Sequence, residues 1–342
     1  MRDVFQRVKL DLPLRAIVWL LAVTLGVAAW PSASPDSSPG AELDPQEITL
    51  ERIIDSESLR KTGSKIVGWI TGGGNLDDGP LIRPYGLAWD GRDLLVTDPG
   101  AGRVLRIGRR GKITAHSSRE ITSPIGIAAC SIGIVVTESE TGRVALLDDD
   151  LRLVEWIAEG LDRPTGVACD EERIFVVETG RHRLLSFDAD DTAATPVLFG
   201  ARGGGDGEFN FPVAMTLDRE RMWVGDTLNF RIQAFDCGTV EYRRSFGGVG
   251  DSPGEMPRIK GLALDASGNV WVTDAHLDLV AIYSVQGQFL GHIGQSGSEP
   301  WEFSFPAGVA AGPDGQMAVA DSLNRRIQIF GVAPPKRKGP AR

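Results

Sequence analysis

Two histidines and several carboxylates stand at positions that could support acid–base or metal chemistry. His276 lies between Asp274 and Asp278, and His182 follows Glu178. Imidazole nitrogens and carboxylate oxygens bind divalent cations and act as general acids and bases. We predict no cofactor; a divalent ion, calcium or zinc, is the one that such a group could hold, with His276 and His182 as candidate ligands and no catalytic residue assigned. The candidate ligand face comprises His276, Asp274, Asp278, His182, Glu178, Glu138 and Glu140.

Some of these acids also belong to a periodic pattern, which favours a structural role for them. In five places an acid at the end of an apolar run is followed five residues later by an arginine. A binding site is normally unique, whereas a feature that supports a scaffold is repeated. We therefore expect structural pairs at Asp98–Arg103, Glu138–Arg143, Glu178–Arg183, Asp226–Arg231 and Asp321–Arg326. After Asp274 the arginine is replaced by Leu279.

The pattern recurs six times, and each copy reads as a small antiparallel sheet. The copies begin at Pro84, Pro124, Pro164, Pro212, Ile259 and Pro306, with 40 to 48 residues between starts. Each contains three short apolar runs separated by turn residues, and a fourth run follows in five copies. A period in the forties made of strands predicts an all-β, six-bladed propeller of four-stranded antiparallel blades over residues 48–332.

Two copies resemble a known repeat closely. The motifs Asp226-x-x-Asn229-x-Arg231-Ile-Gln-x-Phe235 and Asp321-x-x-Asn324-x-Arg326-Ile-Gln-x-Phe330 look like NHL repeats. The resemblance covers residues 65–331, and it implies a six-bladed propeller. It is weaker in the first three copies, where the asparagine position holds Ala101, Thr141 and Arg181.

Enzymes with similar propellers suggest two metal chemistries. NHL-like lyases hold zinc with histidines from several blades, but His116 and His292 of this chain fall in expected outer strands. Lactonase-type propellers hold calcium with Glu, Asn and Asp, which Glu138, Glu178, Asn229 and Asp274 could imitate. Both resemblances are at the level of the fold.

The last copy lacks a fourth strand, so a segment from the N-terminal side must close the ring and cover its open edge. We expect Lys65–Thr71 to take this place, and Ile48–Ile54 is the competing candidate.

The charge distribution argues against nucleic-acid binding. Residues 1–30 carry +2 and residues 336–342 carry +4 of a chain total of −10, so the region between them carries −16. Such a body repels phosphate backbones and favours cationic or neutral partners.

Three cysteines cannot all pair. Cys130 and Cys169 end the inner strands of neighbouring copies, so a disulfide between them is conceivable, but we favour small buried thiols, as for Cys237.

The N-terminal segment predicts export. Ala16–Trp30 is an uncharged run of 15 residues preceded by basic residues, which fits a signal peptide or a membrane anchor within residues 1–30. Residues 31–47 form a Pro/Ser-rich linker, and 333–342 a basic disordered tail. The expected location is periplasmic or extracellular, with attachment to the cytoplasmic membrane through residues 16–30 if they are not cleaved.

These features together favour a non-catalytic scaffold or sensor that presents one loop face to a protein, peptide or glycan. The alternative is a metal-dependent hydrolase or lyase with a site at the central channel. Glycine-rich connections at 72–79, 200–207, 247–254 and 294–297 are expected to contact the ligand. Nearby aromatic residues, including Phe209, Phe211, Phe303 and Phe305, are expected to wedge between blades.

Overall fold

The computed structural model describes residues 48–61, 81–252 and 254–333. These residues belong to one compact unit, Gly40–Arg342. The expected signal or anchor, the preferred closing strand Lys65–Thr71 and nearly all of the basic tail lie outside the described residues. Among the described residues, no helix is long and apolar enough to cross a membrane.

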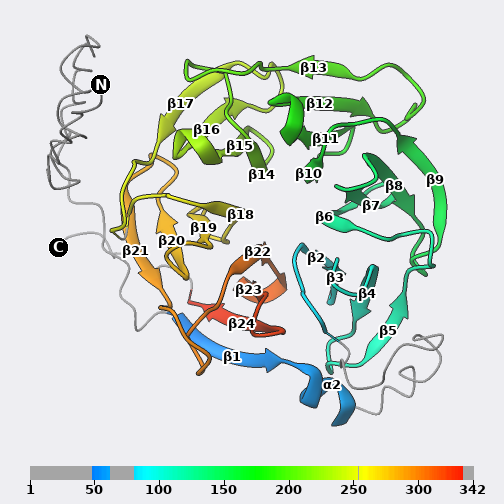
Figure 1. The fold of residues 1–342 in the computed structure, drawn as a ribbon, viewed down its shortest axis with the longest axis vertical. Coiled ribbons are helices and arrows are strands. Elements are labelled where there is room, and N and C mark those ends of the chain that lie inside the picture. The colour runs from blue at the N-terminus through cyan, green and yellow to red at the C-terminus, as the bar shows by residue number, and fades with distance from the viewer. Residues whose placement is uncertain (1–47, 62–80, 253, 334–342) are drawn as a thin grey trace, which may run out of the picture. The chain divides into compact units, whose positions relative to one another are not determined.

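Six four-stranded antiparallel sheets form the blades of a propeller (Figure 1), as the repeats predict. The first three blades comprise β2 (Leu87–Asp90), β3 (Asp93–Asp98), β4 (Arg103–Ile107) and β5 (Ile113–His116); β6 (Pro124–Cys130), β7 (Gly133–Glu138), β8 (Arg143–Leu147) and β9 (Leu153–Ala158); and β10 (Pro164–Cys169), β11 (Arg173–Glu178), β12 (Arg183–Asp188) and β13 (Val197–Phe199).

Blades four to six follow the same order from the channel outward. They comprise β14 (Pro212–Leu217), β15 (Arg221–Asp226), β16 (Arg231–Asp236) and β17 (Tyr242–Phe246); β18 (Ile259–Leu264), β19 (Val270–Asp274), β20 (Leu279–Tyr283) and β21 (Phe289–Ile293); and β22 (Pro306–Ala311), β23 (Gln316–Asp321) and β24 (Arg326–Val332) with β1 (Ile48–Ile54). The described helices are short: α2 (Ser56–Lys61), η3 (Thr179–Arg181), η4 (Thr227–Asn229) and η5 (Pro313–Gly315).

The strand that closes the ring is Ile48–Ile54, which we expected to be only the competing candidate. β1 pairs antiparallel with β24, from Ile48 opposite Val332 to Ile54 opposite Ile327. The expectation for Lys65–Thr71 was therefore wrong. The buried side chains of Ile48 and Ile54 at the two ends of β1 join the cores of blade six, so this strand satisfies both the backbone and the apolar faces of the edge.

Apolar side chains between neighbouring blades form the core. Trp271, Phe303 and Phe330 are fully buried in one cluster shared by blades five and six. Side-chain hydrogen bonds also join the second strand of one blade, or the turn after it, to the next blade: Thr97 Oγ1 donates to Ile125 O at 2.8 Å, and Ser322 Oγ donates to Pro84 O at 2.7 Å. These contacts help to hold neighbouring blades together around the central channel.

The inner strands approach one another too closely for side chains at their glycines. A Cβ placed on Gly126 would lie 2.0 Å from the carbonyl oxygen of Thr165 in the next blade. Substitution by any other residue would therefore push two blades apart.

A disulfide links Cys130 of β6 to Cys169 of β10. This corrects our preference for unpaired thiols. The equivalent ends of neighbouring inner strands bring the two Cα atoms to 5.8 Å, which is an ordinary separation for a disulfide. Cys237 is buried and free.

Candidate functional site

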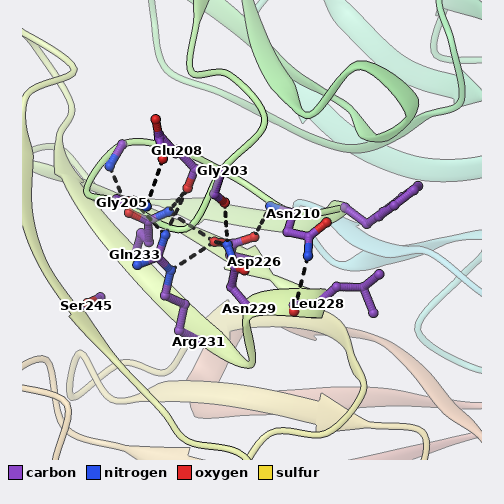
Figure 2. A network of polar contacts seen from close by, with 12 residues as sticks. Gly203, Gly205, Glu208, Asn210, Asp226, Leu228, Asn229, Arg231, Gln233 and Ser245 are labelled. Atoms are coloured by element: carbon purple, nitrogen blue, oxygen red, sulfur yellow. Dashed lines mark hydrogen bonds and ion pairs between the residues drawn. The ribbon is translucent and has the colours of Figure 1, made fainter. Parts of the chain in front are cut away.

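The repeated acids are hydrogen-bonded within the turn where each second strand ends. Asp226 is fully buried, and its carboxylate accepts from the backbone N–H of Asn210 at 2.6 Å and from Arg231 Nε at 2.9 Å. Asn229 Nδ2 donates to the same carboxylate at 2.8 Å, and Arg231 Nη2 continues to Gly205 O at 2.7 Å. Figure 2 shows this network, which ties the glycine-rich connection 200–207 to the turn.

Three of the other acid–arginine pairs also form ion pairs. Ion pairs join Glu138 to Arg143, Glu178 to Arg183 and Asp321 to Arg326 at 2.6 to 2.7 Å, with each acid fully buried. Asp98 and Arg103 are cross-strand partners, and the Asp98 carboxylate accepts from the backbone N–H groups of Ile82 and Arg83.

The balance of burial and hydrogen bonding differs between blades. Burial raises the pKa of Glu138, but hydrogen bonds from Ser123, Thr122, Thr141 and Arg143 outweigh it and leave that pKa below its usual value. At Asp321 burial is the larger effect and the pKa is raised. Both carboxylates are hydrogen-bonded to backbone and side-chain groups at their own turns.

The structure does not bring the candidate ligand-face residues together as a metal site. Asp274 is bound by the backbone N–H groups of Arg258, His276 and Leu277, and Glu140 is exposed. No three His, Cys, Asp or Glu side chains within the described ranges lie close enough to hold a metal ion. The reason is local, because these acids point into their own turns and bind main chain there.

The two histidines have separate surroundings. His276 is exposed, and its Nε2 lies 3.5 Å from Asp251 Oδ1. His182 is buried, and its Nδ1 accepts from the backbone N–H of Phe211 at 3.0 Å. Burial, assisted by Arg202, lowers the pKa of His182, so its neutral form is favoured. Asp278 accepts from Phe305 N at 2.8 Å. His116 and His292 lie in the outer strands β5 and β21, as expected.

The central channel forms a cavity of about 330 Å³ lined by all six inner strands. Its lining consists mainly of glycine, alanine and larger aliphatic residues, with Lys260 and Tyr85 as the largest polar groups near the ends where the strands begin. This is the end at which the repeated acids lie, because Asp98 and Asp274 bind the backbone just before β2 and β18.

Four cations gather at that end, and we call them the cationic mouth: Arg83, Arg163, Arg258 and Lys260. The Cζ atoms of Arg83 and Arg258 each lie 5.7 Å from the centroid of the Phe305 ring, and Lys260 Nζ lies 5.5 Å from it. Arg163 Cζ lies 5.6 Å from the Phe211 centroid. All four contacts are within the range of cation–π attraction.

None of the four mouth cations lies within ion-pair distance of a carboxylate among residues 48–61, 81–252 and 254–333. The carboxylates of Asp98 and Asp274 contact the same two arginines only through the main chain: they accept from the backbone N–H groups of Arg83 and Arg258. The side chains of both arginines are exposed. Burial, and then the charges of Arg258, Arg163 and Arg83, lower the pKa of Lys260 to about 8.

Sequence reasoning missed this mouth, although a signal was present. The three arginines occupy the position just before the first residue of a repeat, at Arg83-Pro84, Arg163-Pro164 and Arg258-Ile259. Phe211 and Phe305 occupy the same position in blades four and six. Phe209 and Phe303 are buried between blades as expected, whereas Phe211 and Phe305 are only half-buried and lie at the mouth.

Comparisons with known proteins agree with the repeats. The NHL repeat model matches residues 303–330, and the model of the SMP-30/gluconolactonase/LRE-like region matches residues 212–305. Together with the six blades around one channel, these matches support an NHL-repeat β-propeller.

A curated relative and two solved structures are also similar. The chain is 30% identical over 144 residues to the E3 ubiquitin-protein ligase TRIM32 of Mus musculus; the match covers 39% of this chain and spans about a fifth (21%) of that protein's length. A streptogramin B lyase structure has a TM-score of 0.56 at 14% identity, covering 74% of this chain and 94% of that one. A gluconolactonase from Xanthomonas campestris has a TM-score of 0.57 at 16% identity, covering 73% and 86%. At these identities the two structures show the fold alone.

Proposed function

We propose that this propeller is a non-catalytic binding module that docks a protein or peptide partner on the face at the cationic mouth. The observation that carries the proposal is the pair of exposed leucines beside the mouth. Leu228 and Leu323 are 47% and 56% exposed. They occupy equivalent turns of blades four and six, and their N–H groups donate to Asn210 O and Ser304 O, next to Phe211 and Phe305.

Exposed apolar side chains around a polar centre are typical of a protein-docking surface. The turns that carry them are held rigidly, because the buried Asp226 and Asp321 networks lie directly beneath them. Figure 2 shows Leu228 at the edge of one such network, with its carbonyl accepting from Asn210. A preorganised surface loses little conformational freedom when a partner binds.

Export to an oxidising compartment remains part of the proposal. The disulfide between Cys130 and Cys169 supports it, since such bonds persist in periplasmic and extracellular proteins and are rare in reducing cytosol. A glycan partner would use the same face.

The match to the SMP-30/gluconolactonase/LRE-like region favours one alternative, a metal-dependent hydrolase or lyase, because the matched residues 212–305 include Asp274, His276 and Asp278. Metal content of the purified chain tests it, with His276→Ala alongside. About one zinc or calcium per chain that is lost in the variant would favour the enzyme and count against the binding module.

Site-specific photo-crosslinking tests the docking face. We expect a photoreactive amino acid at Leu323 or Leu228 to give one adduct of defined mass in the native host. The same group at Val154, which is 60% exposed on the outer strand β9, should give none of that adduct. Identical adducts from all three positions would mean that the partner does not select this face.

A further inference from the structure

We propose that the cationic mouth binds a carboxylate of an acidic peptide segment, which enters the channel beside Phe305 and Lys260. This inference rests on the proposed docking function and names the chemistry that the partner must present. The geometry points to it, because three cations from blades one and five surround a single ring in blade six.

The charged groups of the cationic mouth are all hydrogen-bond donors. Guanidinium and ammonium groups have no acceptor, so a ligand at this position must supply acceptors. Arginine's planar fork matches a carboxylate, and the guanidinium groups of Arg83 and Arg258 both lie against the same Phe305 ring. The four like charges of the mouth repel one another, and a bound carboxylate would relieve that repulsion.

The local charge is opposite to that of the chain as a whole. The chain carries −10, yet the channel entrance gathers four cations and, among the described residues, no carboxylate pairs with any of them. The positive potential of the mouth would attract a short acidic segment. A long polyanion such as a nucleic acid would also be repelled by the acidic surface around the mouth. The half-buried rings of Phe305 and Phe211 would contact the methylene groups of a glutamate side chain.

Lys260 is the deepest of these cations, because it lines the channel cavity itself together with Tyr85. It is faced by Arg258 and Asp274 of its own blade, by Arg83 of blade one and by Arg163 of blade three. Since its pKa lies at about 8, the ammonium form dominates below that pH and the neutral amine above it. A bound carboxylate favours the ammonium form, so affinity should fall as pH rises through 8.

The test uses the full chain and two labelled peptides, acetyl-(Glu-Gly)4-amide and its glutamine counterpart, each with the same uncharged dye. We expect the glutamate peptide to bind, measured by fluorescence anisotropy, and the glutamine peptide to bind at least tenfold more weakly. Arg258→Gln and Lys260→Gln should each weaken the glutamate peptide about tenfold, as expected for loss of a charged hydrogen bond. Arg110→Gln, which removes an exposed charge away from the mouth, should change affinity less than twofold.

Lys260→Arg separates a binding role from a structural one. It should keep the affinity at pH 7 and abolish the loss of affinity between pH 7 and 9. Equal binding of the two peptides, no binding of either, affinity unchanged by Arg258→Gln and Lys260→Gln, or stronger binding of a thymidine oligonucleotide than of the glutamate peptide would each overturn the inference. If crosslinking still selects Leu323 in any of these cases, the docking face stands and only the carboxylate site falls.

Discussion

Asp226→Ala should lower the free energy of unfolding by about 3–5 kcal/mol, because it leaves a buried arginine network without its carboxylate. Four donors converge on that carboxylate: Asn210 N, Asn229 Nδ2, Arg231 Nε and Gln233 Nε2. Asp226 is fully buried, so water cannot replace the lost acceptor without opening the turn. Urea unfolding of the full chain, followed by tryptophan fluorescence, measures the change.

The matched control for this prediction is Asp150→Ala. Asp150 also forms an ion pair, with Arg152, but the two side chains are 66% and 72% exposed. Exposed pairs contribute roughly 0–1 kcal/mol, so the control should unfold almost as the wild type does. Equal losses of stability in Asp226→Ala and Asp150→Ala would show that the buried network is not what holds the turn.

Removing the disulfide should cost about 4 kcal/mol, as the loop-entropy relation gives for a closed loop of this size. Cys130 and Cys169 are 39 residues apart in the sequence and belong to neighbouring blades. The double variant Cys130→Ala/Cys169→Ala is therefore expected to unfold at lower urea than the oxidised wild type.

A reductant provides the control for the disulfide. Dithiothreitol should destabilise the wild type to the level of the double variant and leave the double variant unchanged. Cys237 should not complicate this result, because burial raises the pKa of its thiol and keeps it protonated and unreactive. An oxidised wild type no more stable than the double variant would contradict the prediction.

Periodicity explains why so much of the fold could be predicted from the sequence. A single blade cannot cover its own faces, so self-similar strands at a spacing of 40 to 48 residues require neighbours and a closed ring. The acid and arginine of each turn are close in sequence, at five residues apart, and their pairing in blades two, three, four and six follows from strand geometry alone.

Contacts between distant segments could not be predicted in the same way. Both Ile48–Ile54 and Lys65–Thr71 have the length and apolar character of an edge strand, and only the pairing of β1 with β24 distinguishes them. The disulfide depends likewise on how closely two inner strands approach, which local sequence does not encode.

The sequence by itself determined the architecture of this protein, the number of its blades and the face on which their turns gather, because these depend on repeated local patterns. The tertiary structure alone decided what that face presents. It places His276 and His182 in different surroundings, and it engages candidate carboxylates such as Asp274 in hydrogen bonds within turns. It also assembles Arg83, Arg163, Arg258 and Lys260 from three blades around one channel. Closure of the ring brings together residues as far as 177 positions apart, from Arg83 to Lys260, and their common electrostatic field exists only after that closure.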